Sequence, residues 1–128
     1  MMRRRENLFS IHYPTNFEER KLATEELINI IEKIDDNEII ILGGDFNIGV
    51  EKVGKHKYEF TKSDKYPEYE MLKEHLDKLE NNEDTWFSAN GNGCIDTMFY
   101  SKNIKLLKME TIKTKYSDHS AVYAEFEV

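Results

Sequence analysis

Apolar residues recur along this chain with two spacings, one typical of strands and one typical of helices. Together the two spacings predict a mixed α/β domain. Residues 7–13 carry the β-favouring side chains of a short strand, which Pro14 ends. Residues 38–42 end in an uninterrupted apolar run, a pattern typical of a strand buried on both faces of a sheet. Alternation near the C-terminus predicts a strand with one buried face, formed by Val122, Ala124, Phe126 and Val128.

Two further segments show helical spacing. Thr15 stands three residues before Glu18, the spacing of a capping box, and predicts the start of a helix there. The apolar stripe of this helix is expected at Ala23, Leu27, Ile31 and Ile34. Pro67 fits the first position of a second helix. The stripe of that helix is expected at Tyr69, Leu72, Leu76 and Leu79.

The remaining segments predict shorter elements. Residues 48–66 are irregular and predict a long loop with at most a short strand. Residues 90–93 read Asn-Gly-Asn-Gly, a strong turn signal, so residues 85–87 and 95–100 are expected to flank it as the strands of a hairpin. Another strand is expected at residues 105–111.

These elements predict an α/β (α+β) fold, with one mixed sheet and two helices on one of its faces. With 128 residues, the chain is expected to form one domain, residues 1–128. The pattern does not indicate what covers the second face of the sheet.

Composition narrows the classes of function. The formal net charge of −7 argues against non-specific coating of nucleic acid, which relies on a basic surface, but it is compatible with an enzyme that uses a divalent cation. The only cysteine, Cys94, cannot form a disulfide within the chain, which favours a reducing compartment such as the cytoplasm. No segment reaches the roughly 20 apolar residues of a membrane span. The three arginines at residues 3–5 precede no apolar segment and predict a solvated tail.

Polar side chains suited to phosphate chemistry lie at the ends of predicted strands. Asp45 and Asn47 follow the apolar run and two glycines, and Asp118 and His119 precede the last strand. Carboxylates, an amide and an imidazole supply metal ligands, a water activator and a donor to a developing oxyanion. The glycines are too few for a dinucleotide-type phosphate loop and are expected to allow close approach of the backbone.

Three short motifs in this order resemble the C-terminal half of the endonuclease/exonuclease/phosphatase superfamily, which includes deoxyribonuclease I. They are GDFN at residues 44–47, CIDTMF at 94–99 and SDHSAV at 117–122. The resemblance covers residues 7–128. It implies one half of a four-layer α/β sandwich and a metal-dependent hydrolase in which water attacks a phosphodiester or phosphomonoester.

The resemblance also implies a role for each matching residue. Asp45 corresponds to the carboxylate that orients or deprotonates the attacking water, and Asn47 to the amide that donates to the phosphate. His119 corresponds to the imidazole at the scissile phosphate and Asp96 to the carboxylate paired with it, a pairing that raises the imidazole pKa. Asp118 is expected on the metal side, where Mg²⁺ or Mn²⁺ binds.

Two more polar residues are weaker candidates. His12 matches a strand-end histidine that acts as an acid in the deoxyribonuclease and sphingomyelinase branches, although a structural histidine fits the same position. Asn16 is a further candidate for phosphate contact.

The lysine-rich segment from Lys52 to Lys65 is compatible both with a solvated surface and with substrate binding. Trp86 and Phe87 fit a hydrophobic core better than a base-stacking surface.

Each of the main assignments also has a structural alternative. Asp45 and Asn47 fit an ordinary turn, because Asp, Asn and Gly favour turns. Asp118 and His119 fit a polar loop before an edge strand. Asp96 fits a simple pair with a lysine. All three alternatives leave the order of the motifs unexplained.

The chain differs from the family pattern in one major respect. The N-terminal half of the family supplies an asparagine and the glutamate that is the main metal ligand, and neither has a counterpart here. We therefore expect an incomplete metal site, and a catalytically inactive remnant or interaction module is the alternative to a hydrolase. An exposed sheet face predicts association with an N-terminal-half polypeptide or a second copy of the chain. The motifs leave the substrate open among nucleic acid, phospholipid and inositol phosphates.

Overall fold

The computed structural model describes residues 4–63, 65–89 and 91–128, and its centre is a four-stranded mixed sheet with strand order β1-β2-β8-β5. β1 (Glu6–His12) and β2 (Ile39–Asp45) are parallel. β8 (Asp96–Tyr100) is antiparallel to β2, and β5 (Asp77–Lys78) is antiparallel to β8. The predicted mixed sheet is confirmed.

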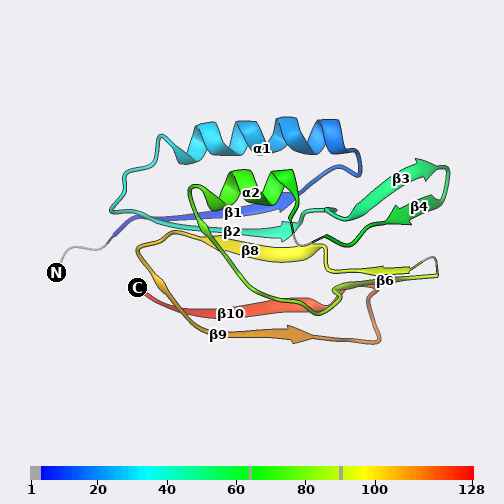
Figure 1. The fold of residues 1–128 in the computed structure, drawn as a ribbon. Helices are drawn as coiled ribbons and strands as arrows, with labels where there is room; N and C mark the ends of the chain where they lie inside the picture. The colour runs from blue at the N-terminus through cyan, green and yellow to red at the C-terminus, as the bar shows by residue number, and fades with distance from the viewer. Residues whose placement is uncertain (1–3, 64, 90) are drawn as a thin grey trace.

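Helices α1 (Phe17–Ile31) and α2 (Pro67–Lys73) lie on one face of this sheet (Figure 1). The core between them and the sheet centres on Phe46, which is fully buried. Its ring centroid lies 5.1 Å from that of Tyr13, 5.7 Å from that of Tyr69 and 5.6 Å from that of Phe99. Because Phe46 directly follows Asp45, this packing fixes the point where the chain leaves β2.

Helix α1 begins one residue later than expected. Its N-cap is Asn16, whose side-chain Oδ1 accepts a hydrogen bond from the N–H of Glu19 at 3.1 Å. The capping box expected from Thr15 to Glu18 is therefore wrong by one residue, because asparagine ranks above threonine as an N-cap. The predicted apolar stripe lies in or against the core, at Ala23, Leu27, Ile31 and Ile34.

Helix α2 is shorter than its predicted stripe. Pro67 occupies the first turn, as predicted, but the helix ends at Lys73. Leu76 and Leu79 are buried beyond the helix. The N–H of Leu79 donates to the carbonyl of Met98 at 2.9 Å, next to the short strand β5. Pairing with β8 thus takes the chain out of the helix that the apolar spacing alone predicts.

The segment expected to be a loop, residues 48–66, contains a hairpin. β3 (Val50–Gly54) pairs antiparallel with β4 (Lys57–Phe60), and His56 in the turn has a positive φ of 62°. β3 carries two consecutive polar residues, Glu51 and Lys52, and β4 is only four residues long, so the apolar pattern of this segment predicts at most a short strand.

The glycine-rich turn also forms a different hairpin from the expected one. β6 (Trp86–Ser88) pairs with β7 (Gly91–Gly93), so the glycines themselves form a strand, and Asn90 lies outside the described residues. Gly91 has a φ of 146°, and a Cβ there would lie 2.9 Å from the ring of Phe60. The expected pairing of residues 85–87 with 95–100 is wrong, because β8 pairs with β2 and β5.

A second layer lies on the face of the sheet opposite the helices (Figure 1). It consists of β9 (Lys105–Ile112) and β10 (Ala121–Glu127), which pair antiparallel. The ring of Phe126 lies 5.0 Å from that of Tyr100 on β8. The expectation of an uncovered second face is therefore wrong for β8. The β1 side stays open, since Leu8 is 70% exposed.

Both helices of the described part of the chain are too short or too polar to cross a lipid bilayer.

Candidate active site

Sheet register brings three of the predicted site residues into one row. Asp45, the last residue of β2, is the partner of His12 on β1 and of Asp96 on β8. Residues that face each other across neighbouring strands project from the same side of a sheet. This row lies where β1 and β2 end and β8 begins (Figure 1).

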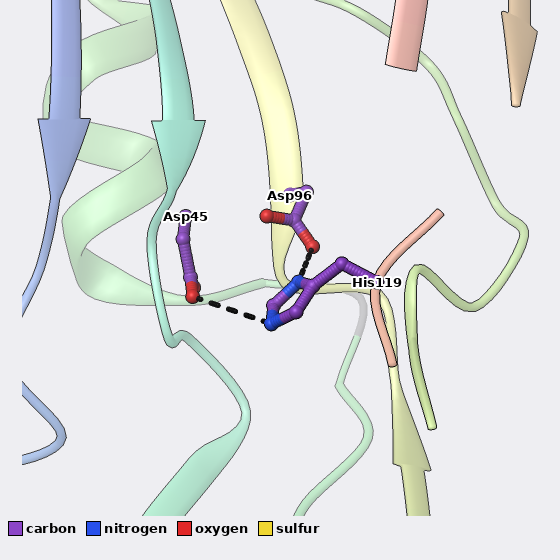
Figure 2. Close-up of side chains that lie close together, drawn as sticks. All are labelled: Asp45, Asp96 and His119. Carbon is purple, nitrogen blue, oxygen red and sulfur yellow. Dashed lines mark hydrogen bonds and ion pairs between the residues drawn. The ribbon is translucent and has the colours of Figure 1, made fainter. Parts of the chain in front are cut away.

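His119 completes the cluster from the segment just before β10. Its Nδ1 lies 2.8 Å from Oδ2 of Asp96, a hydrogen-bonding distance, and its Nε2 lies 4.0 Å from Oδ2 of Asp45 (Figure 2). The imidazole therefore lies between two carboxylates from different strands. The expected pairing of Asp96 with His119 is present in the structure.

The electrostatics of the cluster shift two pKa values upward. Burial raises the pKa of the Asp45 carboxyl, and the charge of Asp96 raises it further, against the opposing effects of the Asn47 N–H and the two histidines. Burial lowers the pKa of His119, but its hydrogen bond to Asp96 and the charges of Asp96, Asp45 and Asp118 outweigh that effect and raise the pKa overall. The cluster thus favours a protonated imidazole and a carboxylate that retains basicity.

Asn47 lies inside the protein rather than on its surface. It is 8% exposed, its Nδ2 donates to the carbonyl of Tyr13 at 2.6 Å, and its backbone N–H donates to Oδ1 of Asp45 at 3.0 Å. Its φ of 50° lets the chain turn sharply after β2. Asn47 therefore orients the Asp45 carboxylate directly, and its donation to a phosphate stays a prediction.

The other candidates lie around the rim. Asp118 is exposed and accepts a hydrogen bond from the indole Nε1 of Trp86 at 3.1 Å. His12 is exposed, with Nε2 3.6 Å from Oδ2 of Asp45. Asn16 caps helix α1. The roles expected for these three residues in binding metal, proton or phosphate stay predictions.

Comparison with known proteins identifies the family of this chain. A family model described as endonuclease-reverse transcriptase matches residues 7–123. The chain belongs to this family. The resemblance to the endonuclease/exonuclease/phosphatase superfamily is thereby confirmed.

Among solved structures, the chain is similar to a humanized D. rerio TDP2 that carries 14 mutations. The TM-score is 0.61 and the sequence identity 17%, and the match covers 94% of this chain and 55% of that chain. This likeness supports the endonuclease/exonuclease/phosphatase fold. The chain spans little more than half the length of the structure it matches. No curated protein matches the sequence of the chain.

The donor set of the cluster fits a divalent cation of the kind on which this family generally depends. Among the described residues, ligand atoms of Asp45, Asp96 and His119 all lie within 4.8 Å of one another. Carboxylate oxygens are the ligands that Mg²⁺ and Mn²⁺ prefer. A cation would also relieve the repulsion between Asp45 and Asp96. The cluster does not include Asp118, whose carboxylate is bound to Trp86.

Sequence reasoning missed Thr85, which is fully buried behind the cluster. Its Oγ1 accepts hydrogen bonds from the backbone N–H groups of Ile95 and Asp96, both at 3.0 Å. Its only signal in the sequence is its place just before Trp86, because a threonine in a predicted strand is an ordinary β-former.

Proposed function

We propose that this chain hydrolyses a phosphoester, with Asp45, Asp96 and His119 as the reaction centre. The observation that carries this proposal is the placement of the His119 imidazole between the two carboxylates, 2.8 Å from one and 4.0 Å from the other. One ring nitrogen is held by Asp96, which leaves the other to face an anion.

Each residue of the centre has a step in this reaction. Asp45 accepts a proton from water as the water oxygen bonds to phosphorus, and the bond from phosphorus to the leaving oxygen breaks. His119 donates from Nε2 to a non-bridging phosphate oxygen and stabilises the added charge. Asn47 offers its remaining amide N–H to the phosphate, and His12 supplies the proton that the leaving oxygen takes up.

In this proposal the carboxylates of Asp45 and Asp96 would hold a divalent cation, with Asp118 as a further ligand. A bound Mg²⁺ or Mn²⁺ supplies Lewis-acid stabilisation of the charge on phosphate oxygens. The choice between the two ions is part of the proposal.

Nucleic acid is the substrate that the surface around the centre favours. The β3–β4 hairpin and the segment after it hold five exposed lysines, at the end of the molecule where β1 and β2 end (Figure 1). The segment that leads to Asp118 carries two lysines and an aromatic ring that is 86% exposed, at Lys113, Lys115 and Tyr116. Lysines neutralise backbone phosphates and exposed aromatic rings stack on bases. A small phosphoester or a lipid headgroup needs fewer of these contacts.

A partner completes the assembly in this proposal. Leu8 on the open side of the sheet and Leu107 on β9 are 70% and 55% exposed. An N-terminal-half polypeptide of the same superfamily, or a second copy of the chain, covers them. We place the protein in the cytoplasm on the ground that Cys94 is its single, unpaired thiol.

The test is metal-dependent cleavage of a single-stranded oligonucleotide, a nicked or abasic duplex and bis(p-nitrophenyl) phosphate. We expect cleavage with Mg²⁺ or Mn²⁺ that EDTA abolishes, with the oligonucleotides favoured over the small diester. Absence of hydrolysis across this panel, with and without an added N-terminal-half polypeptide, would overturn the proposal in favour of a catalytically inactive interaction module.

A further inference from the structure

The residues from Thr85 to Phe87, at the start of strand β6, bridge the two segments that carry Asp96 and His119. The Thr85 hydroxyl accepts from the N–H of Asp96 at 3.0 Å, and the Thr85 carbonyl accepts from the N–H of Ser120 at 2.7 Å. Two residues on, the N–H of Phe87 donates to the carbonyl of Asp118 at 2.9 Å. These bonds tie the start of β8 and the residues on both sides of His119 to the same three residues.

The Trp86 side chain extends this link to the reacting groups themselves. Its indole is stacked with the His119 ring, with centroids 6.3 Å apart and planes 28° apart. Its Nε1 donates to Oδ2 of Asp118 at 3.1 Å. One side chain therefore fixes both the plane of the imidazole and one oxygen of the neighbouring carboxylate.

Two aromatic residues of the β3–β4 hairpin also pack on the indole. Phe60 stacks on Trp86 with centroids 5.6 Å apart and planes 28° apart, and Tyr58 meets it edge-on at 5.7 Å. Phe60 in turn packs on Gly91, where a Cβ would lie 2.9 Å from the ring. Trp86 is only half-buried, so this packing, rather than a deep core, keeps the indole against His119.

We propose that Trp86 and Thr85 are positioning residues that set His119 against Asp96. Thr85 fixes the backbone on the Asp96 side and Trp86 fixes the ring on the His119 side. The catalytic consequence depends on the proposed function, whereas the positioning itself does not. The hairpin that carries the lysines is thereby mechanically linked to the imidazole.

The first test uses Trp86 as a reporter, because it is the only tryptophan of the chain. A protonated imidazole quenches the emission of an indole that it contacts. At pH 5.5 we expect His119→Ala to increase the emission at least twofold, and we expect the matched change His75→Ala to leave it unchanged. Equal emission from the wild type and His119→Ala would overturn the stacked arrangement. This result does not require turnover, so it decides the positioning even if the proposed function fails.

The second test separates positioning from stability through rescue by conservative variants. We expect Trp86→Ala to lower kcat by about 10²-fold with little change in KM, since small displacements of reacting groups cost about that much. Trp86→Phe keeps the stack and recovers most of the rate. Thr85→Ser recovers the rate that Thr85→Val loses, because it restores the hydroxyl acceptor.

Folding is checked for each variant by circular dichroism and thermal unfolding, and rates are compared only below the melting transition. A folded Trp86→Ala protein with wild-type kcat would overturn the proposal. A Trp86→Phe protein as slow as Trp86→Ala would overturn the role of the stack.

Discussion

At the scale of single residues, most polar groups of the site stabilise one another, but the ionised form of one carboxylate is disfavoured by its surroundings. His119 is held by Asp96, and Asn47 donates its N–H to Asp45. Asp45 nevertheless lies partly buried beside a second carboxylate, which raises its pKa. A carboxylate whose ionised form is disfavoured lowers the stability of the fold, which is common where a site needs a base.

Replacing Asp45 by asparagine tests this conflict. The pKa of Asp45 is raised in the folded state, so ionisation costs stability as pH rises above the unfolded value of 3.8. We expect Asp45→Asn to unfold at a higher urea concentration than the wild type at pH 7, while losing any hydrolytic activity.

The advantage of this variant should disappear near pH 3, where the wild-type carboxyl is protonated in both states. Urea unfolding at the two pH values measures it. The opposite result would be a variant that is less stable than the wild type at pH 7 but equally stable at pH 3. It would show that the charge of Asp45 stabilises the fold.

At the scale of elements, close backbone contact fixes the edge where the site lies. Gly44 on β2 is paired with Ile11 on β1, and a Cβ at Gly44 would lie 1.9 Å from the Ile11 carbonyl oxygen. The φ of Gly44 is 147°, which side-chain-bearing residues rarely adopt. The glycine pair thus permits the close approach that the sequence predicts.

We expect Gly44→Ala to separate the ends of β1 and β2 and to destabilise the protein by more than about 3 kcal/mol, through clash and backbone strain together. Gly54→Ala is the matched control, since a Cβ there meets only the Lys57 Cβ at 3.7 Å. Chemical denaturation of both variants gives the comparison. Similar stabilities for the two would mean that the ends of β1 and β2 are not held this closely.

A buried ion pair joins the two helices to the β3–β4 hairpin. Arg20 of α1 donates to Glu68 of α2 at 2.8 Å and also contacts Glu51 and the carbonyl of Val50. Arg20 and Glu68 are 3% and 1% exposed. Removing one partner leaves the other charge buried and unpaired.

We therefore expect Arg20→Met to cost about 3–5 kcal/mol of stability, and the double change Arg20→Met with Glu68→Leu to recover a large part of it. Urea denaturation at pH 7 measures both. A double variant no more stable than Arg20→Met would show that the arginine acts through its other two contacts.

Local periodicity explains which elements the sequence predicts correctly. The apolar stripe from Ala23 to Ile34 and the alternation around Phe126 repeat every few residues, so both can be recognised from the sequence alone. The end of α2 and the β3–β4 hairpin depend on partners far along the chain, such as Met98 for Leu79. The Asp96–His119 pair could be predicted only through motif resemblance. Thr85 was not predicted, because a threonine in an expected strand is an ordinary β-former.

At the scale of the whole molecule, the apolar surface is not fully covered. Leu8 on the open side of the central sheet is 70% exposed, and on the outer layer Leu107, Ile112 and Tyr123 are exposed as well. A two-stranded layer such as β9–β10 is marginal by itself and gains stability when more strands or helices join it. These surfaces are consistent with a further layer that packs on this part of the fold.

We expect the chain to associate in a concentration-dependent manner unless a partner polypeptide is supplied. Sedimentation velocity from micromolar to millimolar concentration measures this, and Leu8→Lys should shift the equilibrium towards monomer. Leu22→Lys, at a position 59% exposed on α1, is the matched control and should have no effect. A stable, monodisperse monomer at the highest concentration would contradict this expectation.

The most direct test of the central claim is the metal-dependent rate of phosphoester cleavage by the wild type and by His119→Ala, with His75→Ala as the control. Because His119 is held by Asp96 and faces Asp45, we predict that His119→Ala lowers kcat by about 10²- to 10⁴-fold, while His75→Ala leaves it unchanged. Equal rates for the wild type and His119→Ala would contradict the account.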